Sequence, residues 1–198
     1  MMTLDRIADH PVDPIFLNRW SPRAFDEANM PHEDLLSILE AARWAPSAFN
    51  IQPWRFLYSH RSDAYWQTYL SLLDDFNRSW AHKASALVFV TSDSMIPARD
   101  GQEGKLSRNH SFDAGAAWAQ LALQATSLGY HAHAMAGIHF DAIKENLSIP
   151  PQYRVEIAIA LGTRGDVSQL DAPLQERELP SERFALNELA FGGAFPND

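Results

Sequence analysis

The chain has 198 residues, 46% of them hydrophobic and 21% charged, which is the balance of one globular domain with a sizeable core. Its formal net charge is -9, so phosphate backbones and anionic membranes are poor partners. It has no cysteine, which excludes disulfides, thiolate metal sites and thiol nucleophiles. We therefore expect a single domain over residues 1–198.

Neither end of the chain nor its body predicts targeting to a membrane. Residues 1–14 carry acidic residues and no unbroken apolar run, so we expect no secretory signal. No stretch approaches the roughly 18 apolar residues that a membrane-spanning helix needs. We expect a cytoplasmic protein that binds neither nucleic acid nor membrane.

The first half of the chain predicts alternating helices and strands. The helix at 32–45 has acidic residues in its first turn and apolar residues at helical spacing, and Pro46 ends it. The polar segment 93–109, with two glycines, fits either a mobile lid or an ordinary surface loop. The elements expected are a helix at 14–18, a helix at 32–45, a strand at 54–59, a helix at 62–74 and a strand at 86–92.

The second half predicts a long helix at 112–128 and two strands. The apolar face predicted for this helix comprises Phe112, Ala116, Ala119, Leu123 and Ala125. Its many alanines suit a central or dimer-interface helix, and Gly129 is a good stop. The remaining elements are a strand at 132–136, a short helix at 140–148 and a strand at 153–162, with Val155, Ile157, Ile159 and Leu161 expected on one side.

The end of the chain is polar and then apolar. Residues 163–183 are expected to be an extended excursion, and apolar residues return at Leu186, Leu189, Phe191 and Phe195. This pattern fits docking on a second subunit and fits folding back on the same domain equally well. Helices and strands mix without a strict βαβ rhythm and no G-x-G-x-x-G follows a strand, so the fold class predicted is α+β.

Two arginines flank a hydroxyl in the segment Arg19-Trp20-Ser21-Pro22-Arg23. Pro22 disfavours helix at Ser21, and alternate residues of an extended chain point the same way. Arg19, Ser21 and Arg23 could therefore converge on one anion such as a phosphate. The alternative is a solvated basic turn paired with acidic neighbours.

A second polar segment, 45–54, lies in the loop between a helix and a strand. Asn50 and Gln52 each offer a donor and an acceptor, which suits the edge of a heterocycle, and Phe49 and Trp54 could supply apolar walls. The alternative is a turn that satisfies only its own backbone.

Other reactive residue types give weaker patterns. His131 and His133 share one face of a strand, but no third ligand is evident, so polar strand ends are favoured over a metal site. Ser47, Ser107 and Ser111 lack the context of a nucleophile elbow, which argues against a serine hydrolase.

Together these segments resemble the nitroreductase family. The matching motifs are residues 19–23, then a helix, then Ala45 to Trp54. The similarity spans roughly residues 15–195. Its later parts are 113–117 with 128–129, 135–137, 155–162 and 177–180 with the apolar tail.

The resemblance implies a three-layer α+β fold, a central and mostly antiparallel sheet flanked by helices, with a C-terminal tail that extends over a partner subunit. It implies a homodimer with FMN in two sites between the subunits and NAD(P)H as co-substrate. Trp20 and Gln175 stand where family members often have basic residues, and Ala136 stands where one branch has an acidic residue.

The resemblance also implies residue roles. Arg19, Ser21 and Arg23 would hold the phosphate and ribityl end, with Arg23 reaching the N1–C2 edge of the ring. The other implied contacts to FMN are Pro46, Ser47, Asn50 and Gln52 of the facing subunit, the backbone of Ala136 and Gly137 near N5, Arg177 at the phosphate, and Trp20 and Asn77.

The implied chemistry is a ping-pong transfer of hydride from NAD(P)H through flavin N5 to a small acceptor, such as a nitroaromatic, quinone, enone or aldehyde. Because water can supply the second proton, we expect no catalytic acid, base or nucleophile; Arg23 would tune the flavin. The alternatives are a flavoenzyme of the same fold with other chemistry (dehydrogenation, dehalogenation or flavin cleavage), a non-catalytic flavin-binding protein, and an interaction module without cofactor.

Overall fold

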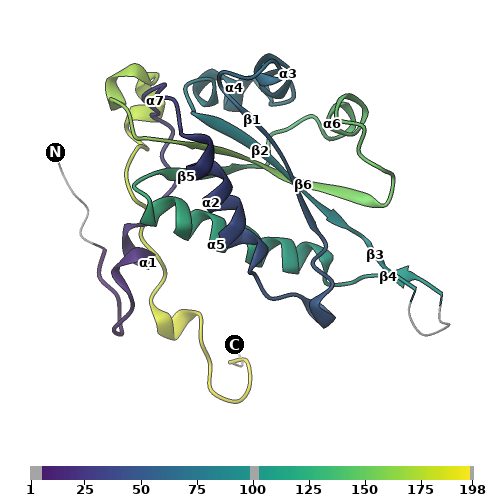
Figure 1. Cartoon of the computed structure of the whole chain (residues 1–198). Helices are drawn as coiled ribbons and strands as arrows, with labels where there is room; N and C mark the ends of the chain where they lie inside the picture. Colours follow the sequence, from purple (N-terminus) through teal and green to yellow (C-terminus); the bar gives the residue numbers. More distant parts are fainter. Residues whose placement is uncertain (1–5, 99–102, 197–198) are drawn as a thin grey trace.

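The computed structural model describes residues 6–98 and 103–196 and is drawn in Figure 1. Its centre is a four-stranded sheet in the order β1-β2-β6-β5, in which each neighbouring pair is antiparallel. The strands are β1 (Trp54–His60), β2 (Ala86–Asp93), β5 (His131–Met135) and β6 (Tyr153–Gly162). Both faces of this sheet are buried under helices.

One face is covered by α2 (His32–Arg43) and α5 (His110–Ser127). Alternate residues of β2, Val88 and Val90, join this layer, as expected for a strand whose side chains point to opposite faces. Leu128 is the C-cap of helix α5, and the following Gly129 takes a φ of 82°, which glycine adopts without strain.

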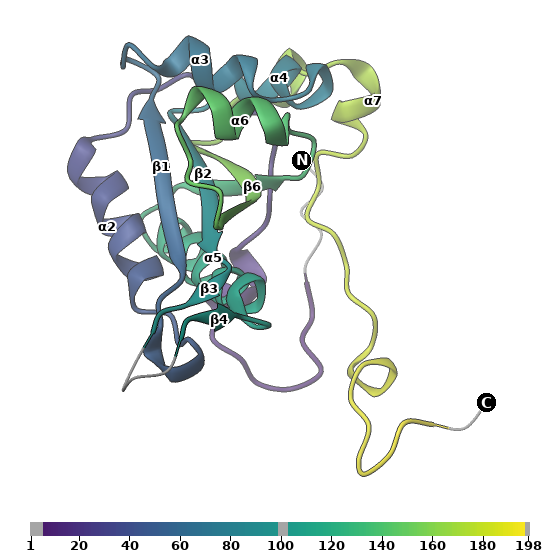
Figure 2. The same cartoon turned by 90° about the vertical axis from the view of Figure 1, so that its right-hand side faces the viewer.

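The other face is covered by four short helices (Figure 2), and Leu87 and Phe89 of β2 pack among them. They are α3 (Trp66–Ser71), α4 (Asp75–Ala81), α6 (Phe140–Asn146) and α7 (Ala172–Gln175). The predicted α+β class, with helices on both sides of an antiparallel sheet, is confirmed.

The C-terminal tail leaves the body of the molecule (Figure 2). From residue 181 to residue 196 every residue is exposed, including Phe184, Leu189 and Phe195. The remaining short elements are α1 (Pro14–Asn18), η1 (Ala48–Asn50), β3 (Met95–Ile96), β4 (Lys105–Leu106), η2 (Val167–Gln169) and η3 (Leu186–Glu188).

Two predicted segments differ clearly from the structure, whereas the ends of several other elements differ by one or two residues. The helix predicted at 62–74 is limited to α3, because a turn bonded to the end of β1 precedes it and Leu73 pairs with Ile138 in an isolated bridge. The excursion at 163–183 is not wholly extended, since it contains η2 and α7. The tip of the predicted lid, 99–102, lies outside the described residues, and β3 pairs with β4 on either side of it.

The predicted apolar face of α5 was correct in part, since Ala125 is buried and Ala116 is packed against the core. Phe112 is 81% exposed and Ala119 is also exposed, whereas Ala117, Leu121 and Ala122 are buried. The helix therefore packs on the sheet through its smaller residues, which allow a close approach to the strands. The larger Phe112 lies on the side of the helix that is exposed to solvent in this chain.

The predicted alternation along β6 was also wrong at one end. The ladder between β2 and β6 shifts register between Val90 and Thr91, so that Glu156 is the extra residue of a bulge. The bulge moves Val155 to the layer of the short helices, while Ile159 and Leu161 face α2 and α5.

Within the described ranges, no helix has both the length and the apolar character that crossing a bilayer requires.

Candidate cofactor site

The arginine segment follows α1 and is fixed by residues far away in the sequence. The backbone N–H groups of Arg23 and Ala24 donate to Oε1 of Glu178, at 2.6 and 2.8 Å. The carbonyl of Pro22 lies 2.9 Å from Nδ1 of His133. The segment is thus held between strand β5 and the chain after α7.

The predicted site arginines lack acidic partners. Among residues 6–98 and 103–196, no carboxylate oxygen lies within 4.0 Å of the guanidinium nitrogens of Arg19, Arg23 or Arg177, although surface arginines elsewhere form ion pairs. Burial lowers the pKa of Arg19, and the charge of Arg183 lowers it further. An acidic chain in which these cations form no ion pair offers a place for an anion.

Arg23 has a partly buried guanidinium. Burial and the nearby Arg177 lower its pKa, while the charge of Glu178 raises it. Its Cζ lies 5.9 Å from the centroid of the Trp80 ring, and its Nε is buried without a hydrogen-bond partner among the described residues. This buried N–H suits an external acceptor.

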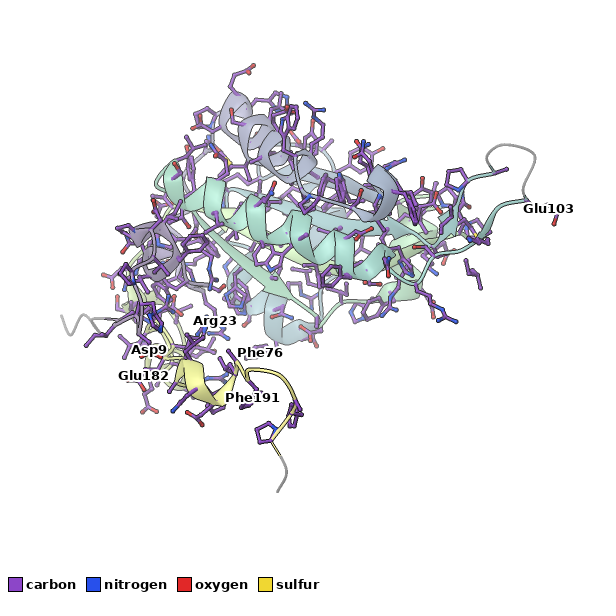
Figure 3. All side chains as sticks on the ribbon, turned by 90° about the horizontal axis from the view of Figure 1, so that it is seen from below. Asp9, Arg23, Phe76, Glu103, Glu182 and Phe191 are labelled. Carbon is purple, nitrogen blue, oxygen red and sulfur yellow. The ribbon has the colours of Figure 1, made fainter. Side chains whose placement is uncertain are left out.

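The convergence of Arg19, Ser21 and Arg23 on one anion remains a prediction, and each arginine has a second cation nearby. The electrostatic neighbours of Arg19 include Arg183, and those of Arg23 include Arg177. Ser21 is half-buried, and its hydroxyl forms no hydrogen bond within the described chain. Figure 3 shows Arg23 on the side of the molecule from which the tail leaves.

The side chain of Trp20 is packed against its neighbours rather than exposed to solvent. Its side chain is 9% exposed and lies between Arg164, whose Cζ is 5.2 Å from the ring centroid, and His131, whose ring centroid is 6.0 Å away. Its side chain is therefore better placed to anchor the segment than to contact a ligand.

The turn after β5 is built on the start of α4. The carbonyl of Gly137 accepts from the backbone N–H of Asp74 and from Nδ2 of Asn77, at 3.0 and 3.1 Å. A Cβ on Gly137 would lie 2.0 Å from Oδ2 of Asp74, so any other residue would displace the side chains of Asp74 and Asn77. Ala136 is exposed, and the N–H of Gly137 donates to no described residue. Asn77 therefore holds this turn.

The loop after α2 stores backbone strain. Phe49, Asn50 and Gln52 have φ values of 53°, 54° and 53°, in a region that non-glycine residues rarely adopt. Such strain persists where the surroundings impose it and is typical of functional sites. Phe49 is 83% exposed, and Pro46 and Asn50 are also exposed.

Few contacts hold this loop within one chain. The hydroxyl of Ser47 accepts from the N–H of Gln52 at 3.0 Å, and Nε2 of Gln52 donates to the carbonyl of Asn50. The long-range bond runs from the N–H of Ala48 to Oδ2 of the buried Asp113, at 3.1 Å. The side-chain amide of Asn50 has no hydrogen bond among the described residues.

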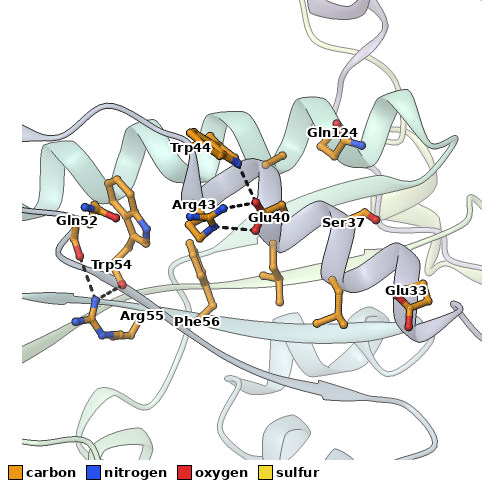
Figure 4. Close-up of a pocket in the computed structure, with 13 residues that line it drawn as sticks. Glu33, Ser37, Glu40, Arg43, Trp44, Gln52, Trp54, Arg55, Phe56 and Gln124 are labelled. Atoms are coloured by element: carbon orange, nitrogen blue, oxygen red, sulfur yellow. Dashed lines mark hydrogen bonds and ion pairs between the residues drawn. The ribbon is translucent and has the colours of Figure 1, made fainter. Parts of the chain in front are cut away.

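The loop and the arginine segment are apart in one chain. Figure 1 places η1 and α1 toward opposite ends of α5. A groove of about 950 Å³ lies beside α2 and β1, and of the predicted site residues only Gln52 lines it. There Glu40 accepts from Arg43 and from Nε1 of Trp44 (Figure 4). The predicted site is thus not one closed pocket of a single chain.

Comparison with known proteins identifies the family. The sequence profile of the nitroreductase family matches residues 17–70 and 59–163 of this chain. The chain belongs to the nitroreductase family. A crystal structure of an oxidoreductase containing FMN is 51% identical to it, covers 100% of both chains and superposes with a TM-score of 0.95.

Two curated proteins are also similar to this nitroreductase-family chain. An uncharacterized 15.4 kDa protein of Mycolicibacterium smegmatis is 38% identical over 140 residues, which are 69% of this chain and 90% of that protein. The CLA biosynthesis enone reductase of Lactiplantibacillus plantarum is 26% identical over 181 residues, which are 75% of this chain and 83% of that protein.

Sequence reasoning missed several residues of the site in this nitroreductase-family chain. Glu178 follows Arg177 directly, yet nothing local shows that its carboxylate bonds to residues 23 and 24. The sequence also does not indicate that His133 contacts the carbonyl of Pro22. The described residues contain no cluster of three potential metal ligands, and burial lowers the pKa of both histidines, that of His133 to about 4.

Proposed function

We propose that this chain is an FMN-dependent oxidoreductase that takes hydride from NAD(P)H. One observation carries the proposal: in a protein of net charge -9, Arg19, Arg23 and Arg177 form no ion pair within the described residues, and Glu178 is the carboxylate that acts on Arg23 from a distance. The FMN phosphate supplies the missing negative charge. Membership of the nitroreductase family and the 51% identical FMN-containing oxidoreductase support it.

The residues present fit this cofactor. Arg19, Ser21 and Arg177 would hold its phosphate and ribityl end, and the buried Nε of Arg23 supports a contact at the N1–C2 edge of the ring. The free N–H of Gly137, beside Ala136, suits an acceptor such as N5.

The loop residues would come from a second subunit. In Figure 1 the segment 46–52, which contributes Pro46, Ser47, Asn50 and Gln52, lies apart from the arginine segment of its own chain. The side-chain amide of Asn50 has no hydrogen bond among the described residues, so it could bind the ring. Trp20 and Asn77 would act mainly through the backbone segments that they anchor.

Bound FMN would supply the chemistry of hydride transfer from NAD(P)H to a small acceptor through N5, in a ping-pong turnover. Arg23 would hold positive charge where the reduced ring gains negative charge, and this stabilises the reduced form. No described side chain is required as acid or base, since water can reach an exposed turn such as Ala136. The similarity to an enone reductase supports enones beside nitroaromatics and quinones as acceptors.

The proposed assembly is a homodimer. Phe16, Trp44 and Phe112 are 55%, 70% and 81% exposed, and every residue of the tail from 181 to 196 is exposed. Apolar surface of this extent is typical of an interface. The tail would then extend over the partner subunit.

The test is the visible spectrum of the purified protein, followed by anaerobic titration with NADPH and NADH. We expect a bound yellow flavin that either nucleotide bleaches and that an added acceptor restores. Bound flavin that resists both nucleotides would favour a non-catalytic flavin protein. A colourless protein whose melting temperature FMN does not raise would refute the proposal. Turnover across acceptor classes separates reduction from the other chemistries of the fold.

A further inference from the structure

Arg23 is surrounded by residues from three distant elements. Glu178, after α7, accepts the N–H groups of residues 23 and 24. His133, on β5, bonds the carbonyl of Pro22. Trp80, on α4, places its ring 5.9 Å from the guanidinium carbon and 4.6 Å from the ring of His133. Backbone and side chain of one arginine are therefore fixed together.

The carboxylate of Glu178 is buried, and burying a charged group costs free energy. The residue is 1% exposed, Oε1 accepts two hydrogen bonds, and Oε2 is buried without a partner among the described residues. A buried carboxylate has to be compensated by hydrogen bonds and by nearby positive charge. Here the compensation comes from the backbone at residues 23 and 24 and from the charge of Arg23.

We propose that Glu178 is a positioning residue for Arg23: its carboxylate fixes the backbone of residues 23 and 24 so that the guanidinium is directed at the cofactor. His133 supports the same geometry from residue 22. The inference rests on the proposed function, because it takes FMN as the group that Arg23 meets. Glu178 itself bonds backbone groups rather than the cofactor.

If Glu178 only stabilised the fold, its substitution would have a different effect. Glu178→Ala would then lower FMN affinity, if at all, by the same factor whether or not Arg23 is present. A positioning residue acts through Arg23, so its effect disappears once that side chain is removed. Glutamine keeps the acceptor oxygen of Glu178, so Glu178→Gln should restore the geometry.

The experiment is a double-mutant cycle between Glu178→Ala and Arg23→Ala. The FMN dissociation constant is measured from the recovery of flavin fluorescence on dilution of the holoprotein. We expect Glu178→Ala to weaken FMN by about tenfold or more in the wild-type background, and by less than about twofold in the Arg23→Ala background. Glu178→Gln should stay within about twofold of wild type.

Glu156→Ala is the matched control. Glu156 is also mostly buried and accepts from two hydroxyls, Ser92 and Ser111, but it belongs to the bulge of β6. It should destabilise the fold without weakening FMN. Equal factors for Glu178→Ala in both backgrounds, or no weakening at all, would overturn the proposal.

Two provisions keep the outcome clear. If Glu178→Ala does not fold, the same cycle is run with His133→Phe, which removes the bond to Pro22 and keeps a ring against Trp80; additivity with Arg23→Ala then overturns the proposal. Failure of the wild-type chain to bind FMN refutes the proposed function. Normal FMN binding by wild type with an additive cycle refutes only the role of Glu178.

Discussion

The arginine segment and the 46–52 loop both come from short motifs, but the fold holds them in opposite ways. The segment is fixed by hydrogen bonds to Glu178 and His133, which are separated from it by 155 and 111 residues in the sequence. The loop has three non-glycine residues with positive φ and one long-range hydrogen bond, to Asp113. One region is buried and fixed, and the other is exposed and strained.

This difference indicates what each region lacks. Hydrogen-bond donors that are already held in place bind a charged ligand most strongly. A segment that is fixed within one chain therefore needs only the ligand to complete its interactions. A strained, exposed loop needs surroundings that impose its conformation. In one chain Asp113 is the long-range contribution, so we expect a second subunit to supply the rest.

The largest effect should follow removal of the tail. A chain that ends at Pro180 loses the exposed apolar residues of the tail but keeps Arg177 and Glu178. We expect its mass in light scattering to fall from dimer to monomer. Leu106→Asp, at a site 74% exposed outside the tail, should remain dimeric. A truncated chain that stays dimeric would contradict the role of the tail.

The pH dependence of stability tests how the arginine segment is fixed. Burial lowers the pKa of His133 from 6.5 to about 4. Above pH 6.5 the ring is neutral in both states and the stability is fully present. Below it the unfolded chain takes up a proton that the folded chain refuses, so the free energy of unfolding falls by on the order of 3 kcal/mol down to about pH 4.

Urea unfolding between pH 4 and pH 7 measures this fall. His133→Gln keeps an N–H donor and cannot titrate, so its curve should be flatter over the same range. An unchanged slope in that variant would assign the titration to another group.

Removal of the candidate cation tests the segment directly. Arg23→Ala should weaken FMN about 10- to 100-fold, because a hydrogen bond to a charged group is worth roughly 1.5–3 kcal/mol. Flavin reduction, followed by stopped-flow absorbance, should also slow. Arg43→Ala removes an exposed arginine of the groove and serves as control. If Arg23→Ala leaves retention and reduction unchanged, Arg23 has no such role.

The anchor of the loop should have a smaller effect. Asp113→Ala leaves the N–H of Ala48 without its acceptor, which should lower the free energy of unfolding by about 1–3 kcal/mol. Urea denaturation measures the loss. Asp166→Ala, which removes an exposed cap of η2, is the control and should cost less. Equal losses would show that the loop is held by other contacts.

Relief of strain should have the smallest effect and the opposite sign. Phe49 has a φ of 53° and is 83% exposed, so Phe49→Gly should raise the free energy of unfolding of the monomeric truncated chain by up to about 1 kcal/mol. Phe49→Ala keeps the strained backbone and should give no gain. A loss in the glycine variant would mean that the ring is packed within its own chain.

The sequence predicted most elements of the fold, since helices and strands depend on local periodicity and end signals. The helix expected at 32–45 and the strand expected at 86–92 are found as α2 and β2. The two motifs at 19–23 and 45–54 could also be recognised in the sequence, because each is a short run of consecutive residues. Their proposed roles remain predictions.

Only the tertiary structure decided the choices that depend on distant residues. Periodicity alone did not show that α5 buries Ala117 rather than Phe112, or that a bulge at Glu156 turns Val155 to the other layer. Nor could it pair Glu178 with residues 23 and 24. Local sequence patterns determine where helices, strands and turns form. Burial and hydrogen bonding between distant residues depend on packing in three dimensions.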